Sequence, residues 1–440
     1  MKFLLYGLLY LATAGIIASS LLLAPHPVDT FLLTLFRLVI LCFASLLLVK
    51  YTFYMVLSPW FASRERKQKF APPHRRPLIS VMIPAWNEEV GLLSTIKSLL
   101  ASTYRPLELV VINDGSTDKS DEMMRQFLRK YALDSPTDVS KASISYYYQK
   151  NAGKGAALNT AIARSHGDIL VSIDADCIVS ETAIAAFVEA FRDPNVAAAV
   201  GNVKIGNTKT LIGTIQALEF AFSFYFKKAD GLLNTIYIIG GAAGAFRREV
   251  FTLLGGYSTS NVTEDIELSV RIQNQGWKIA YAHDAVVYTE GATTLYGLMK
   301  QRLRWKRGRI QTFAQYRSLF FSWRRQHNKL LTWCVLPLAF FGDMQLAFEP
   351  FFIALLFGFS WASNDFSPFI SGIIIVSLMF FIQALDARHE QHWAYMLLAP
   401  IGWCLFYVTT FVEMYALTKS ILLLIRKKEL KWQKWQRTGM

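Results

Sequence analysis

Cysteine is scarce in this sequence, and its few positions show no pattern of a disulfide-rich or metal-binding protein. Only four of the 440 residues are cysteines, and they form no CxxC pair or other metal-binding spacing. Three of them lie in apolar runs, where a thiol behaves as a small hydrophobic side chain. We therefore expect no disulfide framework. The four positions are Cys42, Cys177, Cys334 and Cys404.

Acidic side chains are outnumbered, with 32 Asp and Glu against 46 Lys and Arg, which leaves a net charge of +14. Such an excess would suit a nucleic-acid partner, but no recognised nucleic-acid module interleaves aromatic residues with this charge. The basic residues cluster instead beside apolar runs, as at 64–69, 74–76 and 426–428. This pattern is typical of the cytoplasmic flanks of membrane spans and of attraction to anionic lipid headgroups. We therefore expect membrane lipid, and no nucleic acid, as a partner.

The chain is 53% hydrophobic, with 32 Phe and 11 Trp, which predicts a membrane protein that carries one substantial soluble domain. Residues 3–23 and 31–57 form two apolar runs joined by a Pro-His-Pro turn at 25–27. A signal peptide would instead show a small-residue cleavage site after a shorter apolar core. We predict two transmembrane helices within residues 1–60. The basic residues that follow place the next domain in the cytoplasm.

Residues 78–292 alternate between strand and helix patterns, which predicts a Rossmann-like α/β domain. Residues 78–84, 107–112 and 169–173 are short apolar runs suited to buried parallel strands, and 88–101 carries apolar residues at helical spacing. Acidic motifs follow the second and third of these strands. Open α/β sheets bind ligands at the carboxyl ends of parallel strands, so both motifs are candidates for a binding site.

Asp114 lies in the Asn-Asp-Gly sequence that ends the second predicted strand. A carboxylate at this place can accept hydrogen bonds from a uracil imide or a ribose hydroxyl, and Gly115 lets the backbone come close. Pro84, Asn87 and Glu88, at the end of the first strand, are expected to line the same nucleotide pocket. The alternative is an ordinary turn between a strand and a helix.

Lys154 lies in an Asn-Ala-Gly-Lys-Gly sequence at 151–155 that resembles a phosphate-binding loop only faintly. The loop lacks the Walker spacing and the Ser or Thr after the lysine, so an ATPase is not expected. Lys154 can still hold a nucleotide diphosphate as a point charge near a helix start. A glycine-rich turn with a solvated lysine is the alternative.

Asp174 and Asp176 form an Asp-Ala-Asp triplet at the end of the third predicted strand. In extended backbone, residues two apart point to the same side, so both carboxylates are expected to converge on one divalent cation. Oxygen ligands favour Mg²⁺ or Mn²⁺, which can neutralise a nucleotide diphosphate as a glycosidic bond breaks. Triplets of this kind also arise by chance.

Thr263, Glu264 and Asp265 precede a predicted helix at 266–275, with Thr263 as its N-cap. Acidic residues in a first helical turn often only complement the helix dipole. An inverting sugar transfer, however, needs a carboxylate that takes the proton from the acceptor hydroxyl. We predict Asp265 as this general base, with Glu264 and Thr263 shaping the pocket.

Gln301, Arg304 and Trp305 lie in a basic amphipathic stretch, 295–313, that is expected to rest on the membrane surface. Trp305 offers a flat face for stacking a sugar ring, while Gln301 and Arg304 suit contacts with a diphosphate and with hydroxyl groups. The membrane location and a role in the active site are compatible.

The succession of Asn-Asp-Gly, Asp-x-Asp, Thr-Glu-Asp and Gln-x-x-Arg-Trp resembles the processive branch of glycosyltransferase family 2. The resemblance covers about residues 80–312 by motif, and it implies a GT-A fold and an inverting transfer from a UDP-sugar to a growing polysaccharide. It also implies that the glycine-containing segment 240–247 lies near the acceptor. By residue, it implies Asp114 at the nucleoside, Asp174 at the diphosphate, Asp176 at the metal, Asp265 as base, and Gln301, Arg304 and Trp305 at the donor diphosphate and acceptor terminus.

Among members of this branch, the plan most resembles synthases of poly-β-1,6-N-acetylglucosamine, a biofilm exopolysaccharide. This likeness implies UDP-GlcNAc as donor, a plasma-membrane location and room for a small membrane partner subunit. Synthesis of another β-glycan, such as cellulose, chitin or hyaluronan, is an alternative. Others are a non-processive transferase acting on a polyprenyl-phosphate lipid, which would not need Gln-x-x-Arg-Trp, and a membrane scaffold that binds the nucleotide without turnover.

The last third of the chain has three apolar runs, 333–361, 366–385 and 393–425. Three full crossings would leave the basic tail outside. Either the tail departs from the positive-inside tendency or, as we expect, the first run, with Asp343 and Glu349, is partly interfacial or re-entrant. Its carboxylates would face either a polymer path or neighbouring helices. The predicted organisation is two spans (1–60), a linker (61–77), the GT-A domain (78–292), interfacial helices (293–330), a membrane region (331–425) and a basic tail (426–440).

Overall fold

The computed structural model describes residues 49–67, 75–133, 142–362, 364–386 and 397–428, together with residues 7, 11, 15, 31, 35 and 439. Most of the two predicted N-terminal spans, part of the linker and most of the basic tail lie outside these residues. The predicted α/β domain, 78–292, lies within them except for residues 134–141.

A mixed eight-stranded sheet forms the centre of the fold, in the order β3-β2-β1-β4-β7-β6-β8-β5. The half from β3 to β4 is parallel, as the apolar runs predicted for β1, β2 and β4, whereas β7 runs antiparallel to β4 and β6. The strands are β1 (Ile79–Ala85), β2 (Leu107–Asp114), β3 (Ser143–Gln149), β4 (Ile169–Ser172), β5 (Cys177–Val179), β6 (Val196–Ile205), β7 (Gly244–Arg247) and β8 (Lys278–Thr289).

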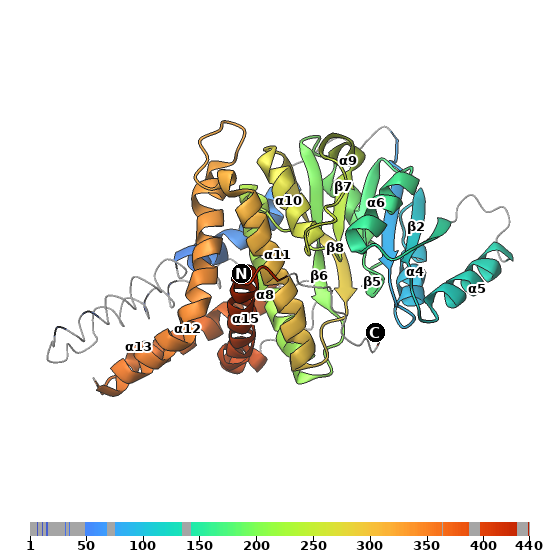
Figure 1. The fold of residues 1–440 in the computed structure, drawn as a ribbon. Coiled ribbons are helices and arrows are strands. Elements are labelled where there is room, and N and C mark those ends of the chain that lie inside the picture. The colour runs from blue at the N-terminus through green and yellow to red at the C-terminus, as the bar shows by residue number, and fades with distance from the viewer. Residues whose placement is uncertain are drawn as a thin grey trace.

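Helices cover both faces of this sheet (Figure 1), and alternate strand residues point into two cores. Ile79, Val81 and Ile83 of β1 pack in the core that also contains residues of α4 and α7, while Met82 packs with residues of α6, α9 and α10. The helices around the sheet are α4 (Leu92–Leu100), α5 (Ser120–Leu133), α6 (Lys154–Arg164), α7 (Ala183–Ala190), α8 (Leu211–Leu233), α9 (Arg248–Leu254) and α10 (Glu264–Asn274).

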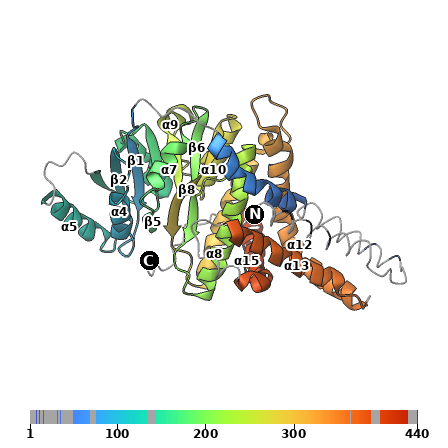
Figure 2. The ribbon, with the colours of Figure 1, turned by 180° about the vertical axis from the view of Figure 1, so that it is seen from behind.

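The remaining helices lie on one side of the sheet. In both views, α4 and α5 lie at one end of the molecule and α12 and α13 at the other, with α8 and α15 between α12 and the sheet (Figures 1 and 2). Figure 1 shows α11 beside α8 in the same layer. The elements are η1 (Ser58–Trp60), α3 (Phe61–Lys67), α11 (Leu295–Gln315), η2 (Arg317–Leu319), the π-helical turn η3 (Leu331–Val335), α12 (Leu336–Ala362), α13 (Ser367–Asp386), η4 (Ala399–Ile401) and α15 (Gly402–Ile425).

Two stretches of the described chain are long and apolar enough to cross a membrane. They are Leu331–Ala362, which comprises η3 and α12, and Cys404–Ile425 within α15; a shorter apolar stretch, Ile373–Gln383, lies in α13. These positions correspond to the three apolar runs that the sequence indicated. Exposed large apolar side chains along α12, such as Phe340, Phe348 and Phe351, give this helix a surface suited to lipid.

Several local boundaries differ from the sequence prediction by one to four residues, and two of them bear on the site. The predicted helix at 88–101 begins only at Leu92, because residues 88–91 form a turn, and Val90 is exposed rather than part of the core. Strand β2 continues through Asp114, all of its residues being buried. The carboxylate of Asp114 is therefore held at the end of the strand itself.

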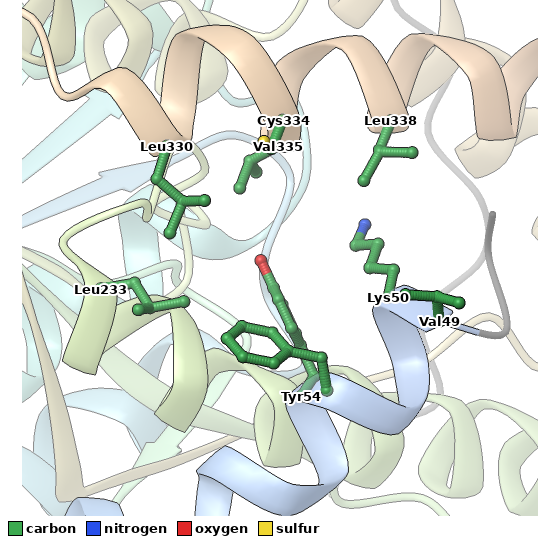
Figure 3. A pocket seen from close by; sticks show the side chains of 9 residues that line it. Val49, Lys50, Tyr54, Leu233, Leu330, Cys334, Val335 and Leu338 are labelled. Carbon is green, nitrogen blue, oxygen red and sulfur yellow. The ribbon is translucent and has the colours of Figure 1, made fainter.

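An apolar cavity of about 310 Å³ lies between helical residues 49–54, the end of α8 and the start of α12 (Figure 3). The ammonium group of Lys50 and the hydroxyl group of Tyr54 point into it from one side. None of the predicted site residues lines this cavity, so it is separate from the carboxyl end of the sheet.

Candidate active site

Asp114 organises the loop that follows β3. Its side chain accepts hydrogen bonds from the side-chain amide of Gln149 (2.7 Å) and from the backbone N–H groups of Ala152 (3.0 Å) and Gly153 (2.8 Å). Gly115, at φ +71°, has no space for a Cβ, which would lie 2.6 Å from the backbone nitrogen of Asn151. Asp114 thus forms part of a turn and also fixes the loop that leads to Lys154. The alternative of an ordinary turn is therefore compatible with a role for Asp114 in the site.

The end of β1 is tied to the end of β2 through Asn87. Its backbone has φ +54°, a conformation that asparagine tolerates better than most residues, and its side-chain oxygen accepts from the backbone N–H of Thr117 at 2.7 Å. The N–H of Glu88 donates to the hydroxyl oxygen of Ser120 at 2.9 Å, and the Glu88 side chain is buried. Pro84 precedes them within β1. The structure places all three at one edge of the sheet, next to Asp114.

Lys154 begins α6 and is surrounded by carboxylates. Its ammonium group lies 2.5 Å from Asp174 Oδ1 and 3.6 Å from Glu264 Oε1. Burial works against the charged lysine, but Asp174, Glu264 and Asp265 together outweigh it and raise the pKa of Lys154 well above its ordinary range. Lys154 is therefore a paired cation at the start of a helix, and the alternative of a solvated lysine is wrong.

Asp174 and Asp176 lie in a turn, and the expectation of extended backbone at this triplet is wrong. The backbone N–H of Cys177 donates to the carbonyl oxygen of Asp174 at 3.2 Å, which closes the turn. Asp174 faces Lys154, while Asp176 is buried beside the start of α4, where a Cβ on Gly91 would lie 3.1 Å from its Cα. The backbone geometry of a strand therefore gives no reason to expect the carboxylates of Asp174 and Asp176 to point to the same side.

The donor set at this edge nevertheless suits a hard divalent cation. Lys154, together with Arg304 beside Glu264, faces the carboxylates of Asp174, Glu264 and Asp265, so acidic side chains outnumber basic ones here. Among the described residues, no group of three or more His, Cys, Asp or Glu side chains is placed to hold a metal by itself. Mg²⁺ is commonly held by one or two carboxylates, with substrate phosphate and water as its other ligands, so Asp174 and Asp176 fit that role.

Asp265 lies at the first turn of α10, and backbone groups hold its side chain. Oδ2 accepts from the N–H of Gly241 at 2.8 Å, and Oδ1 accepts from the N–H of Ile266 at 2.9 Å. A Cβ at Gly241 would lie 2.7 Å from Lys154 Nζ and 3.3 Å from Asp265 Oδ2. A side chain at 241 would make the Lys154 ammonium group shift, while the N–H of Gly241 holds the carboxylate of Asp265 in place.

Glu264 and Thr263 complete the start of α10. Burial raises the pKa of Glu264; Lys154 opposes this shift and Asp265 adds to it. Thr263 occupies the N-cap position, but its side chain makes no capping bond and donates instead to Asn261 Oδ1 at 3.2 Å. The predicted N-cap position is confirmed, and the expected N-cap hydrogen bond is absent.

The Gln-x-x-Arg-Trp sequence lies on α11, as predicted, and packs against the start of α10. A Cβ on Gly308 would overlap the side chain of Thr263, so the two helices meet where α11 carries no side chain. Arg304 is close enough to Glu264 to oppose the rise in pKa that burial causes there. Gln301 is 7% exposed, and its Oε1 accepts no hydrogen bond within the described part of the chain. A buried acceptor of this kind is available to a ligand.

Trp305 is half-buried beside this edge. The guanidinium group of Arg302 lies 4.3 Å from the centre of its ring, and the ring of Phe220 lies at 6.4 Å. The predicted membrane-surface position for all the basic residues of α11 needs correction, since Arg302, Lys306 and Arg307 are buried between helices. Arg302 and Lys306 pair with carboxylates rather than with lipid headgroups.

Comparison with known proteins identifies the family. The sequence pattern described as "Glycosyltransferase like family 2" matches residues 74–308, more than half of the chain. The chain belongs to glycosyltransferase family 2. This assignment covers the sheet, the acidic motifs and the first part of α11, and it makes the protein a glycosyltransferase.

Curated relatives of this family 2 glycosyltransferase include a poly-β-1,6-N-acetyl-D-glucosamine synthase of Staphylococcus aureus (strain COL). It is 31% identical over 232 residues, which is 52% of this chain and 54% of the relative. A probable glycosyltransferase of Bacillus subtilis (strain 168), YdaM, is also 31% identical over 256 residues, or 57% and 59% of the two chains. The aligned part spans about half the length of these relatives. The expected likeness to poly-N-acetylglucosamine synthases is confirmed.

The fold of this glycosyltransferase is shared with a solved structure, a mannosyltransferase of Pyrobaculum calidifontis determined in complex with GDP-mannose and Mn²⁺. The TM-score is 0.55 at 21% identity, over 89% of this chain and all of the other. The likeness supports a mixed α/β, GT-A-like fold with a curled sheet. The predicted fold class is confirmed to this extent.

The contacts that hold the site of this glycosyltransferase together are not evident from its sequence. The glycine-containing segment 240–247 is expected near the acceptor, but nothing in the sequence indicates the hydrogen bond from Gly241 to Asp265. The close packing at Gly308 could have been predicted from the sequence, because a glycine in the middle of a basic amphipathic helix indicates that another element packs against it. Both glycines are places where one element approaches another without an intervening side chain.

Proposed function

We propose that this protein is an inverting, processive β-glycosyltransferase that polymerises a UDP-sugar at the membrane, with UDP-GlcNAc as donor and poly-β-1,6-N-acetylglucosamine as product. The observation that carries the proposal is the packing of α11 on α10 at Gly308 and Thr263. It joins the Gln-x-x-Arg-Trp helix to the proposed base. A polymer synthase is expected to carry the Gln-x-x-Arg-Trp sequence on such a helix, whereas a transferase that adds a single sugar does not need it.

In this proposal Asp265 takes the proton from the acceptor hydroxyl as its oxygen attacks the anomeric carbon, and UDP leaves from the opposite face. Backbone bonds from Gly241 and Ile266 orient the Asp265 carboxylate for this role. Lys154 offers a charged donor to the diphosphate, and Asp114, with Pro84, Asn87 and Glu88, frames the nucleoside. Gln301 and Arg304 contact the donor diphosphate, and Trp305 stacks on the acceptor terminus.

We assign the divalent cation, Mg²⁺ or Mn²⁺, to Asp174 and Asp176. When bound, it would neutralise the charge that develops on the diphosphate leaving group. The excess of carboxylates around Lys154 supports a cation here, as does the presence of Mn²⁺ in the mannosyltransferase complex that shares the fold.

We place the catalytic domain (78–292) on the cytoplasmic face of a plasma membrane, between N-terminal spans within 1–60 and the membrane region 331–425, with α11 at the interface. The apolar stretches Leu331–Ala362 and Cys404–Ile425 support this arrangement. The proposal includes membrane lipid as surroundings and a small membrane partner subunit. A growing polysaccharide is the acceptor.

The test is to incubate the purified full chain separately with UDP-GlcNAc, UDP-glucose and UDP-glucuronate, in Mg²⁺ or Mn²⁺, and to measure UDP release. We expect release from UDP-GlcNAc, no release after chelation of the metal, and a long product that a β-1,6-specific N-acetylglucosaminidase digests. Activity with UDP-glucose alone would refute the donor assignment. A single sugar attached to a polyprenyl phosphate would refute processivity.

A further inference from the structure

Three cations on one face of α11, two of them buried and one half-buried, lie among carboxylates from other helices. Arg302, Lys306 and Arg309 recur at helical spacing, so their side chains share a face. Arg302 is 3% exposed, and its guanidinium group donates to Glu219 Oε2 of α8 at 2.6 Å. Its Nε lies 3.3 Å from Glu413 Oε1 of α15. One arginine thus connects three helices.

Lys306 and Arg309 extend this network to α12. The ammonium group of Lys306 lies 2.7 Å from Asp343 Oδ1 and 2.6 Å from Glu413 Oε2, and Arg309 also pairs with Asp343. Asp343 is therefore used in contacts between helices, and the expectation that it faces a polymer path has no support from these contacts. Asp343 and Glu413 lie in the two stretches that are apolar enough to cross a membrane.

The network face of α11 lies next to the face that carries the site. Gln301, Arg304 and Gly308 form the second face, and Gly308 packs on Thr263 at the start of α10. A rotation of α11 about its axis would move both faces together. The network therefore fixes the rotation that aims Gln301 and Arg304 at the site.

The charges of the network balance, with three cations against three carboxylates. Buried ion pairs contribute little net stability against an apolar alternative, but removal of one partner leaves an uncompensated buried charge. Such a network is thus better suited to fix an arrangement than to stabilise the fold.

We propose that Asp343 and Glu413 are positioning residues, which act through Lys306 and Arg302 to hold the Gln-x-x-Arg-Trp face of α11 against the catalytic edge. The proposal rests on the proposed function. It assigns to the two apolar helices a role in aligning the active site, in addition to any role in the membrane.

Glu413→Gln and Asp343→Asn test this in the full-length protein with UDP-GlcNAc as donor. We expect kcat to fall about tenfold in each, with the donor KM changed less than about threefold, because small displacements of positioned groups cost rate steeply. The matched control is Glu349→Gln, which removes another carboxylate from α12, the helix that carries Asp343. The Glu349 carboxylate accepts a hydrogen bond from Gln345 and takes no part in the network. It should retain kcat.

The double variant Lys306→Gln/Glu413→Gln separates positioning from stability. It leaves Arg302 with Glu219 and Arg309 with Asp343, so the charges balance again. We expect its kcat to recover at least about threefold over Glu413→Gln, a non-additivity expected of groups in direct contact. The thermal unfolding midpoint, measured in parallel, shows how much protein is folded in each assay.

Three results would overturn the proposal. They are unchanged kcat in both single variants, a loss fully explained by less folded protein, and no recovery in the double variant. Failure of the proposed function is distinguishable, because the wild-type protein would then release no UDP from any UDP-sugar. In that case hydrogen exchange of the α11 backbone decides: Glu413→Gln must lower its protection and the double variant must restore it, or the proposal fails.

Discussion

The charged cluster at the carboxyl end of the sheet and the charged network on α11 differ in balance and in access to solvent. Around Lys154, two cations, Lys154 and Arg304, meet three carboxylates, and the side chains of Lys154 and Asp174 remain 28% and 30% exposed. In the network, three cations meet three carboxylates, and their side chains range from 3% exposed at Arg302 to 21% exposed at Glu219. The unbalanced, open cluster is suited to receive charged ligands. The balanced, closed network is suited to hold helices in place.

If the open cluster carries the chemistry, its carboxylates should matter most to rate. Asp265→Asn keeps an oxygen that can accept from Gly241 but removes the proposed base. We expect kcat for UDP release from UDP-GlcNAc to fall by about 100-fold or more, the usual contribution of a general base. Binding of UDP, measured by calorimetry, should change little.

The control for this prediction is Glu189→Gln on α7, which replaces an exposed carboxylate whose partner is Arg192. Its UDP release should equal that of the wild-type protein. Unchanged release by Asp265→Asn would remove the base assignment and leave the cluster as a structural feature of the helix start.

The contact between α11 and α10, which joins the two regions, should give the next largest effect on kcat. Gly308→Ala should push α11 away from α10, because the added Cβ overlaps the Thr263 side chain. We expect kcat to fall about tenfold through misplacement of Gln301 and Arg304. Alanine favours helix over glycine, so any loss would not come from weaker helix formation.

Gly358→Ala is the matched control for Gly308→Ala, since a Cβ at Gly358 of α12 meets no heavy atom within 4 Å. It makes the same chemical change in a helix that leaves room for it, and UDP release should be unaffected. Equal activity of the two variants would mean that close packing at Gly308 does not align the site.

The sequence predicts the open cluster far better than the closed network, and the reason is physical. Apolar runs locate β1, β2 and β4, and parallel strands necessarily bring the residues after them to one edge. Asp114 and Asp174 can thus be assigned to one edge from their positions along the chain, because each lies at the end of a predicted strand. Lys154 begins a helix after β3, a strand that the sequence does not predict.

The network is not predictable in this way because its partners are distant in sequence and lie in apolar runs. Arg302 pairs with Glu219, 83 residues earlier, and Lys306 pairs with Asp343, 37 residues later. Helical periodicity shows which residues share a face, but not which helix covers it. The basic face of α11 therefore suggests lipid headgroups as its partners. The antiparallel strand β7 is also not predicted, since its four residues show no clear alternation of apolar and polar side chains.

The smallest predicted effect concerns the pH dependence of the open cluster. Burial raises the pKa of Glu264 above its ordinary value near 4.5, with Lys154 opposing and Asp265 adding to the shift. A carboxyl group with a raised pKa in the folded state favours folding below its ordinary pKa, and that contribution is lost as the pH rises through the raised value. Glu264→Gln cannot ionise, so it does not undergo this loss.

We therefore expect Glu264→Gln and the wild-type protein to have similar unfolding midpoints at about pH 4, where both side chains are neutral, and the variant to gain relative stability toward about pH 8. Thermal unfolding across this range measures the difference, with Glu189→Gln as the reference for replacing a glutamate outside the cluster. The balanced network has no part in this change, so the gain should persist in the Glu413→Gln background. A relative stability that falls with rising pH would mean that Lys154 stabilises ionised Glu264 more than burial destabilises it, and the open cluster would then be better balanced than its contacts indicate.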